Sequence, residues 1–312
     1  MAVERALFFV EPRKVEVREV PAREPHDGEV VAHALASGVS PGTELLLYRG
    51  EGPTPFDPSL GTTTYPCRYG YAWVGETSAG TRVFALATHG DRHCLFPGHY
   101  HELPKHIPAT RAVLAANLET ALTCAWDSEV VFGDRAVVFG AGVVGTLTAW
   151  ILMLSGAKVT VIEPREGRRA CARELLGSGV NVIATPETAQ ADVVIEATGR
   201  PETLDAAIRV ATSGARVVVA SFYGQRRAAV DLGDAFHRRR LTLVASQVSA
   251  LPPRIAARFD VDRRFATVIE LLGQPALDAL VGAPTPFERA PQLYEALDRD
   301  PAGLPCPVFV YR

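Results

Sequence analysis

A glycine pattern near the middle of the chain could do chemistry through its backbone. The residues from Gly140 to Gly145 read G-A-G-V-V-G, between the apolar run RAVVF and a helical pattern. Gly140 suits a tight turn, Gly142 lets a ligand approach the backbone, and Gly145 lets a helix pack closely on a strand. After a strand and before a helix, this spacing predicts a loop that binds the pyrophosphate of a dinucleotide. We expect the whole loop to take part: Gly140, Ala141, Gly142, Val143, Val144 and Gly145.

Glu163 supplies the second part of this pattern. It ends the next strand-like run, KVTVI, and lies 23 residues after Gly140. A carboxylate at about this distance accepts hydrogen bonds from the ribose hydroxyls of the adenosine. It would also repel a 2′-phosphate, which favours NAD(H) over NADP(H). Arg165, Arg168 and Arg169 follow at once and could hold such a phosphate, so Arg168 is a further cofactor-binding candidate. The alternative is a glycine-rich turn in an α/β fold that binds no nucleotide.

Strand-like and helical segments alternate around the glycine loop. Strands are predicted over 135–140, 158–164, 181–184, 191–198, 215–224 and 241–248, and helices over 110–130, 143–156, 165–179 and 201–214. Strands that are apolar throughout and alternate with helices indicate a parallel sheet covered on both faces. The fold class is therefore α/β, with a doubly wound Rossmann domain over 117–247.

The region before this domain has a different character. Residues 1–108 are rich in Pro and Gly and carry short strand-like runs at 6–10, 14–20 and 28–39. This pattern predicts a mostly β domain, which we place at residues 1–116. We expect residues 248–312, with a helix over 261–274 and a final strand PVFVYR, to complete it.

Composition excludes several classes of protein. The chain has 312 residues, 47% of them hydrophobic, which is enough for one large or two ordinary cores. A net charge of −3 gives no reason to expect nucleic acid or an acidic membrane as partner. The longest mainly apolar run, 143–154, is too short to span a membrane, and the first ten residues lack a signal-peptide core. We expect a soluble cytoplasmic protein. The five cysteines form no CxxC pair, so neither a disulfide framework nor a zinc knuckle is predicted.

The order of these parts resembles the medium-chain dehydrogenase/reductase superfamily of the zinc alcohol dehydrogenase type, over nearly the whole chain. SGVSPGTELLLYRG (37–50) is similar to the stretch around the family's first zinc-ligand cysteine. YGYAWVGE (69–76) stands where the family has Gly-His-Glu, and NLETALTCAW (117–126) looks like the helix of the third ligand. SPGTE, the Gly-Tyr pair at 70–71 and the short length resemble the subgroup that contains bacteriochlorophyllide hydroxyethyl dehydrogenases. The resemblance implies a GroES-like N-terminal domain and a homodimer formed through the Rossmann domain.

The zinc ligands of that family do not carry over. The cysteine position is Ser40 or Pro41, the histidine position is Tyr71, and the neighbouring glutamate is Ala72. Only Glu119, at the third position, keeps a plausible ligand type. A catalytic zinc needs three protein ligands, so we expect no zinc and no other metal.

Tyr71, Thr43 and His89 are the catalytic candidates. Tyr71 stands at a former ligand position, where a phenol could donate a hydrogen bond to a carbonyl or take a proton from an alcohol. Thr43 matches the proton-relay hydroxyl of the family, and His89 ends a stretch that lies near the substrate cleft in the fold it resembles. The alternatives are that Tyr71 only fills the space of the metal and that Thr43 is an ordinary turn residue. His89 with His93, His99 and His101 could form a replacement metal site, although their spacing matches no standard zinc motif.

In the fold that the chain resembles, we expect Thr123 and the loop Ala197-Thr198-Gly199 to face the nicotinamide, with Ser221 and Phe222 nearby. The expected activity is a metal-free, NAD(P)(H)-dependent interconversion of an alcohol and a ketone or aldehyde, with a small-molecule substrate. One alternative is the reduction of a conjugated C=C bond, as in enoyl and quinone reductases of the superfamily. Another is a protein that binds a dinucleotide without turnover.

Overall fold

The computed structural model describes residues 2–52, 64–186, 189–300 and 306–312. It divides into two compact units. Unit 1 comprises Met1–Ala116 and Leu272–Arg312, and unit 2 comprises Asn117–Leu271. Unit 2 therefore extends past residue 247, where the sequence analysis ended the Rossmann domain.

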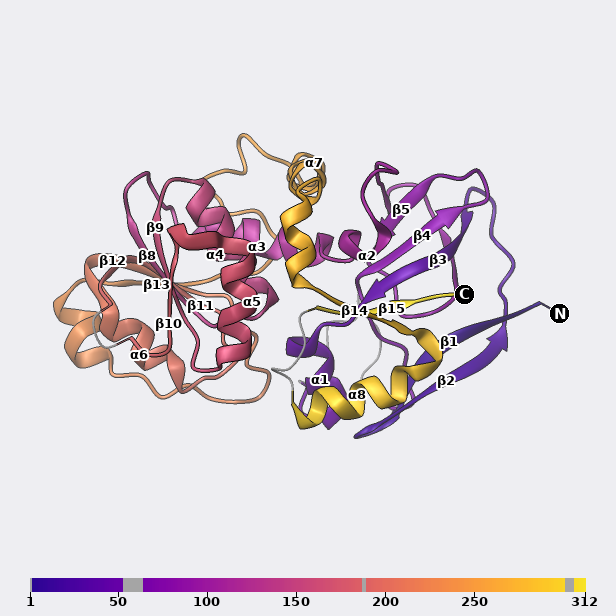
Figure 1. Cartoon of the computed structure of the whole chain (residues 1–312), viewed down its shortest axis with the longest axis horizontal. Coiled ribbons are helices and arrows are strands. Elements are labelled where there is room, and N and C mark those ends of the chain that lie inside the picture. The colour runs from indigo at the N-terminus through magenta and orange to yellow at the C-terminus, as the bar shows by residue number, and fades with distance from the viewer. Residues whose placement is uncertain (1, 53–63, 187–188, 301–305) are drawn as a thin grey trace. The chain divides into compact units, whose positions relative to one another are not determined.

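Unit 2 is built on a six-stranded parallel sheet, labelled in Figure 1. Its strands, in spatial order, are β10 (Asn181–Ile183), β9 (Lys158–Ile162), β8 (Arg135–Phe139), β11 (Ala191–Glu196), β12 (Ala211–Val219) and β13 (Thr242–Ala245). Phe139 at the end of β8 pairs with Ile162 on one side and with Glu196 on the other, so the three strands end at the same edge. The chain turns from one half of the sheet to the other at β8, where open α/β sheets bind their ligands.

Helices cover this sheet on both faces. Those that pack on it are α4 (Val143–Leu154), α5 (Glu166–Leu176) and α6 (Thr203–Val210), while α3 (Ala115–Asp127) and α7 (Val261–Leu272) are the other α-helices described in this unit. Figure 1 shows α4 and α5 on one side of the sheet and α6 on the other. Between α6 and the sheet lie Phe139, Val194, Leu204, Ile208 and Val217, all buried. The predicted doubly wound Rossmann fold is confirmed.

One predicted helix is shorter than expected. The sequence pattern continued it from 201 to 214, but α6 ends at Val210 and β12 begins at Ala211. Thr212 explains the change, because its hydroxyl donates a hydrogen bond of 2.9 Å to the Ala191 carbonyl of β11. A tertiary contact thus draws this segment into the sheet.

Unit 1 is mostly β, as predicted. Its main sheet has seven strands: β14 (Val281–Pro286), β15 (Cys306–Val310), β3 (Val30–Gly38), β4 (Trp73–Thr77), β5 (Arg82–Ala85) and β7 (His101–Glu102) in spatial order, with β6 (Arg92–Leu95) paired to β3. A separate antiparallel pair is formed by β1 (Val3–Glu11) and β2 (Lys14–Pro21). The C-terminal strand β15 pairs with β3, which starts at residue 30, so distant parts of the sequence complete one sheet.

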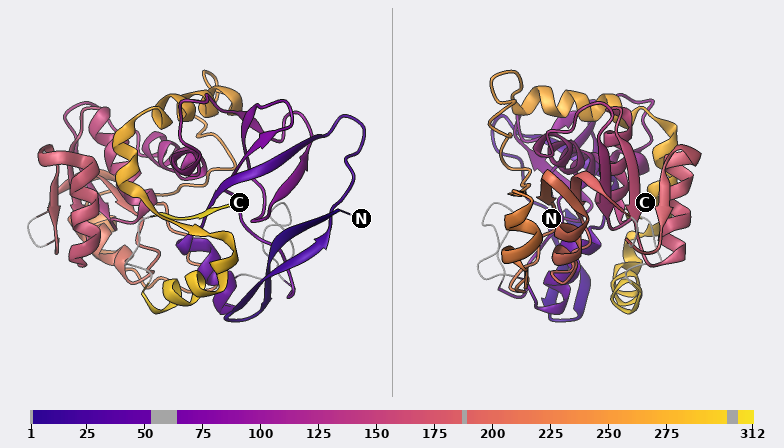
Figure 2. Two further views of the ribbon diagram at one scale, coloured as in Figure 1. Left: turned by 45° about the vertical axis from the view of Figure 1, so that its right-hand side comes forward. Right: turned by 90° about the vertical axis from the view of Figure 1, so that its left-hand side faces the viewer.

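In the described part of unit 1 there are three α-helices: α1 (Pro41–Arg49), α2 (Ala109–Ala112) and α8 (Ala290–Arg299). The sequence analysis did not predict α1, although Pro41 at its first position and the left-handed Gly50 at its end are common helix boundaries. Helix α1 packs against α8, as both figures of the ribbon show (Figures 1 and 2). Leu45, Leu47 and Tyr48 join the core there, which explains why so short a helix forms.

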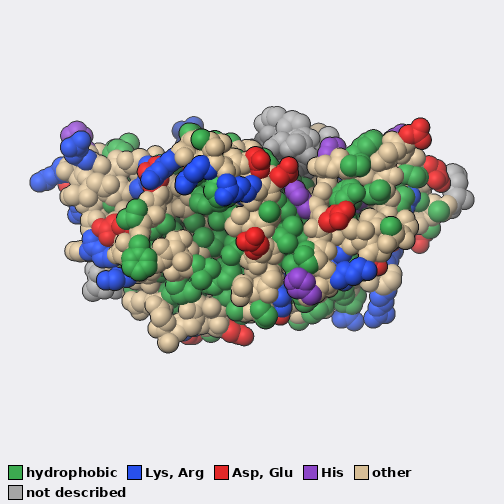
Figure 3. Space-filling view, turned by 90° about the horizontal axis from the view of Figure 1, so that it is seen from above, with side chains coloured by type: hydrophobic (Ala, Val, Ile, Leu, Met, Phe, Trp, Pro, Cys, Tyr) green, Lys and Arg blue, Asp and Glu red, His purple; other side chains and the backbone are tan. Residues whose placement is uncertain are grey.

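Two observations bear on the expectation that neither a membrane nor nucleic acid is a partner. Within the described ranges, no helix is both long and apolar enough to cross a membrane. On the face shown in Figure 3, basic and acidic side chains are interspersed. That face does not carry the continuous field of one sign that attracts nucleic acid.

Candidate functional site

A chain of hydrogen bonds between fully buried polar side chains runs through unit 1. Glu44 on α1, His89 between β5 and β6, and Ser37 on β3 each have no exposed surface. His89 Nε2 lies 3.0 Å from Glu44 Oε2, and His89 Nδ1 lies 2.7 Å from Ser37 Oγ. Ser37 Oγ is also 2.7 Å from the hydroxyl of Tyr311, which follows β15 and is partly exposed. The chain therefore extends from α1 to Tyr311, just after the last strand.

Glu44 receives two further hydrogen bonds. The backbone N–H of Ser40 donates to its Oε1 at 2.7 Å, and the hydroxyl of Tyr294 on α8 donates to its Oε2. Burial, together with the nearby Glu44 charge, raises the pKa of Tyr294, so its hydroxyl keeps its proton. A buried carboxylate needs such donors in place of water, and Glu44 has them.

Tyr71 and Thr43 lie together beside this chain. The hydroxyl of Tyr71 is 3.5 Å from Thr43 Oγ1, and its ring packs edge to face against Tyr69. Burial raises the pKa of Tyr71 to about 12, although hydrogen bonds between its hydroxyl and the side chains of Ser40 and Thr43 oppose the rise. Tyr71 is consequently a protonated donor near neutral pH. The structure brings Ser40, Thr43 and Tyr71 together as three neighbouring hydroxyls.

His89 is placed differently from the other two catalytic candidates. It is fully buried, and both of its ring nitrogens are engaged, by Glu44 and by Ser37. It can therefore act on a bound molecule only through its neighbours. The other histidines considered for a metal site have separate environments: His93 Nε2 donates to the Thr88 carbonyl, and burial lowers the pKa of His93 to about 4.

The donor set does not fit a catalytic zinc. Ser40 and Tyr71 offer neutral hydroxyls and Ala72 offers none, whereas zinc binds thiolate, imidazole or carboxylate groups. Glu119 is held by Arg264 of α7, whose Nη2 and Nε lie 2.7 and 3.0 Å from its Oε1. Across the residues that the structure describes, no three His, Cys, Asp or Glu side chains gather in a way that could hold a metal ion.

The Glu119–Arg264 pair was missed by the sequence analysis. Both side chains are nearly buried, and Arg264 also donates to the Val248 carbonyl at 2.8 Å and to Thr123 Oγ1 at 3.4 Å. The pattern of α7 did contain a signal, because Arg264 shares its buried stripe with Val268 and Leu272, each one turn apart. This pair binds α7 to α3 and explains why unit 2 extends to residue 271. Thr123, expected at the nicotinamide, also donates to the Glu119 carbonyl at 2.9 Å.

The glycine loop of unit 2 follows β8. Gly140 has a φ of +97°, and a Cβ on Gly145 would lie 2.0 Å from the Gly140 carbonyl oxygen, so the fold itself needs both glycines. A Cβ on Gly142, in contrast, would meet open space. Helix α4 begins at Val143 with Gly142 as its N-cap and receives no side-chain cap there. Its first N–H groups are therefore available to an anion above Gly142.

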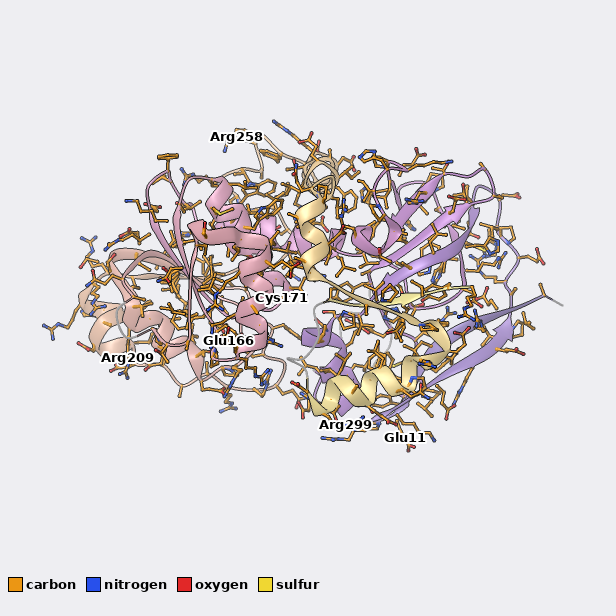
Figure 4. The ribbon with its side chains drawn as sticks, viewed as in Figure 1. Glu11, Glu166, Cys171, Arg209, Arg258 and Arg299 are labelled. Carbon is orange, nitrogen blue, oxygen red and sulfur yellow. The ribbon has the colours of Figure 1, made fainter. Side chains whose placement is uncertain are left out.

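Glu163 closes one side of this loop. Its carboxylate is almost fully buried and accepts hydrogen bonds from the backbone N–H groups of Ala141, at 3.2 Å, and Arg165, at 3.1 Å. Arg168 Nη1 lies 3.7 Å from the same carboxylate. Arg169 is engaged by Glu166, which Figure 4 labels on α5. The two parts of the dinucleotide pattern are thus in contact with each other.

A second buried carboxylate, Glu196, ends the neighbouring strand β11 and was not anticipated. It accepts hydrogen bonds from the Thr198 N–H at 2.9 Å and from the Tyr223 hydroxyl at 2.5 Å. The Gly199 N–H donates to Ser221 Oγ at 2.8 Å, which joins the ends of β11 and β12. Of the candidates for the nicotinamide, Ala197, Thr198 and Ser221 thus lie at one edge of the sheet, followed by the half-exposed Phe222.

Known proteins share both the sequence pattern and the fold. A family model of zinc-binding dehydrogenases matches residues 143–272. The 2-desacetyl-2-hydroxyethyl bacteriochlorophyllide A dehydrogenase of Cereibacter sphaeroides is 28% identical over 331 residues, which cover 96% of each chain.

Solved structures superpose over almost the whole length. A short chain alcohol dehydrogenase from Escherichia coli CFT073, complexed with NADH, has a TM-score of 0.79 at 18% identity and covers 99% of this chain and 100% of its own. A protein from Sinorhizobium meliloti 1021, solved bound to NADP, has a TM-score of 0.79 at 19% identity with the same coverage. At these identities the likeness shows the fold, and the two neighbours differ in the nicotinamide cofactor that they hold.

The open space above Gly142 yields a direct test of the loop. Gly142→Ala should fold normally, because its Cβ meets no atom, but the methyl group should occupy the space of a pyrophosphate. We expect an unchanged melting temperature and a Kd for NADH raised at least about tenfold, which corresponds to roughly 1.4 kcal/mol. Isothermal titration calorimetry measures the affinity. Gly179→Ala, at another glycine with open surroundings in unit 2, is the control and should bind NADH as the unmodified protein does. Normal NADH binding by Gly142→Ala would refute this assignment of the loop.

Proposed function

Since the chain belongs to the medium-chain dehydrogenase/reductase superfamily of oxidoreductases, we propose that it is a metal-free, NAD(H)-dependent enzyme. In this proposal it interconverts an alcohol and a ketone or aldehyde of small molecular size. The observation that carries the proposal is the group of three hydroxyls, Ser40, Thr43 and Tyr71, at the positions where the zinc enzymes of the family have ligands or a relay. The Tyr71 phenol, protonated near neutral pH, is the group that would replace the metal.

The residues of unit 2 fit a nicotinamide dinucleotide. The free N–H groups at the start of α4 would bind the pyrophosphate over Gly142, and Glu163 would accept hydrogen bonds from the adenosine ribose. The 197–199 segment, Ser221 and Phe222 are assigned to the nicotinamide end. When bound, this cofactor supplies or accepts the hydride, and the protein has to orient and polarise the substrate.

Tyr71 would act on the substrate oxygen. A carbonyl oxygen gains negative charge as hydride reaches its carbon, and a fixed O–H donor stabilises that charge more than it stabilises the ground state. Because its pKa is about 12, Tyr71 keeps a proton available for this purpose. Thr43, 3.5 Å away, would orient the phenol and pass the proton on.

Reduction of a conjugated C=C bond is the second candidate. It is favoured by the same loss of zinc ligands, since that reaction requires no Lewis acid. A panel of small ketones, aldehydes and enones, assayed by the consumption of NADH, distinguishes the two reactions. The absence of turnover with every class would favour a dinucleotide-binding protein without activity.

Glu163 makes the cofactor preference testable. A ligand that binds only the folded state stabilises it by RT ln(1 + [L]/Kd), about 2.7 kcal/mol at a hundredfold excess over Kd. We expect NADH to raise the melting temperature more than NADPH at equal concentration. Glu163→Gln keeps an acceptor for the ribose while it removes the charge, so the difference should narrow or reverse. If NADPH already stabilises the unmodified protein more, then the arginines after Glu163 decide the preference and the assignment is wrong.

Tyr71→Phe tests the catalytic role. It deletes the hydroxyl and retains the ring, and the loss of a donor used in the transition state typically lowers kcat by about 10²–10³. We expect such a loss on the best substrate of the panel, with the melting temperature and the affinity for NADH nearly unchanged. Tyr69→Phe removes a neighbouring buried hydroxyl and should leave kcat intact. Near-normal turnover by Tyr71→Phe would show that Tyr71 only fills space.

A further inference from the structure

We propose that Glu44, His89, Ser37 and Tyr311 form a proton relay. It would connect the solvent with the three neighbouring hydroxyls of Ser40, Thr43 and Tyr71. The proposal rests on the function proposed above, because the reduction of a carbonyl consumes a proton at the substrate oxygen and its reversal releases one. Tyr71 can give its proton once per turnover and must then be resupplied. The buried Glu44 directly follows Thr43 in the chain, so the side chains behind it offer this proton a route through the protein.

Between Glu44 and Tyr311 the geometry provides an unbroken series of short contacts. Glu44 is separated from His89 by 3.0 Å, His89 from Ser37 by 2.7 Å, and Ser37 from Tyr311 by 2.7 Å. The first three side chains have no exposed surface, whereas Tyr311 is partly exposed beside the C-terminal residue. Every member can both accept and donate a proton. A fully buried carboxylate–imidazole pair is costly for a fold to keep, which suggests that it serves a function.

The inner end of the relay lies at Tyr71. Glu44 directly follows Thr43 in α1, and its Oε1 is fixed by the Ser40 N–H at 2.7 Å. The hydroxyl of Tyr71 interacts with those of Ser40 and Thr43. It also lies close enough to Glu44 for the carboxylate charge to contribute to the raised pKa of Tyr71. In the proposed relay, the proton crosses from Glu44 to Tyr71 through the Ser40 hydroxyl or one bridging water molecule.

The hydrogen bonds of this chain can run in either of two directions, depending on which group of each pair is the donor. A switch from one set of directions to the other moves one proton along the chain. In the first, the hydroxyl of Tyr311 donates to Ser37 Oγ, the Ser37 hydroxyl donates to His89 Nδ1, and His89 Nε2–H donates to the Glu44 carboxylate. In the second, protonated Glu44 donates to Nε2, Nδ1–H donates to Ser37 Oγ, and Ser37 donates to the hydroxyl oxygen of Tyr311, which keeps its own proton. Conversion of the second into the first shifts each hydrogen by one place. Its net result is the transfer of one proton from Glu44 to water, and the reverse supplies Glu44 with a proton from water.

The neighbouring titratable groups do not compete for this proton. Tyr294 on α8 and Cys306 on β15 both face Glu44, and burial raises the pKa of each, so they stay protonated. On the side of His89, burial lowers the pKa of His93 on β6 to about 4, so that ring stays neutral. Asp91 faces the outer end, where burial raises the pKa of Tyr311.

Two substitutions interrupt the relay outside the pair. Ser37→Ala removes the link between His89 and Tyr311, and Tyr311→Phe removes the outer hydroxyl while its ring stays packed on Phe287. Tyr294→Phe is the matched control, because it deletes a hydroxyl that donates to Glu44 but lies off the path. The first measurement uses NMR of the imidazole nitrogens, labelled with ¹⁵N, to follow the exchange of the His89 ring proton with solvent, and it needs no substrate.

We expect this exchange to slow in Ser37→Ala and Tyr311→Phe and not in Tyr294→Phe. A network that only holds the fold would behave in the opposite way, because its loss would loosen the site and speed up exchange. Unchanged or faster exchange in the two relay variants would overturn the proposal.

The second measurement uses turnover on the best carbonyl substrate of the panel. Both relay variants should lose kcat by roughly 10²-fold, a typical contribution of proton transfer, and added imidazole should restore part of it by carrying protons to the site. Tyr294→Phe should gain nothing from imidazole. Slow exchange combined with normal turnover, or a loss that imidazole does not restore, would overturn the use of the relay in catalysis. A failure of the proposed function would look different, because the unmodified protein itself would show no turnover.

Discussion

The burial of the Glu44 carboxylate is the constraint on which the organisation of unit 1 depends. A charge with no exposed surface costs several kcal/mol unless donors replace its water. The donors come from separate parts of the chain: the N–H of Ser40 at the start of α1, the hydroxyl of Tyr294 on α8 and the ring of His89 after β5. The three donors can reach the Glu44 carboxylate together only when α1, α8 and the segment after β5 are packed in one particular arrangement. That arrangement also fixes Thr43, next to Glu44 in α1, and sets the hydroxyl of Tyr71 beside it.

In the proposed function, this arrangement takes the place of the zinc ion with which the zinc enzymes of the family activate a substrate oxygen. A zinc ion accepts electron density and brings no proton, whereas a phenol stabilises developing charge by hydrogen bonding and can also transfer its proton. A phenol with a pKa of about 12 therefore needs a supply of protons. The replacement of metal ligands by hydroxyls and the presence of a buried carboxylate–imidazole pair next to them are in this account two aspects of one chemistry. In unit 2, Arg264 neutralises the one carboxylate that remains at a ligand position, so Glu119 serves to join α3 and α7.

The sequence predicts the sheet of unit 2 and its glycine loop well, because both depend on local patterns. Apolar strands alternate with helices, and Gly140 and Glu163 stand at a spacing that the strand and helix lengths impose. The pairing of Tyr71 with Thr43 came from resemblance to a family. Helix α1 was missed because it is short and is stabilised by its packing on α8 rather than by its own pattern.

The buried ionic groups could not be derived in the same way. Glu119 and Arg264 are 145 positions apart in the sequence, and Glu44 and Tyr294 are 250 apart. No periodicity relates such pairs, since only the tertiary fold brings them together. His89 was singled out for its type and location, but its role as a buried neighbour of Glu44 followed only from the coordinates.

The zinc content of the purified protein tests the central claim most directly. Elemental analysis by mass spectrometry after dialysis against a chelator counts the metal ions that remain per chain. The account predicts no stoichiometric zinc, together with a protein that still binds NADH. About one zinc per chain that survives chelation would contradict it, because a catalytic zinc requires three protein ligands that the positions of Ser40, Tyr71 and Glu119 do not supply.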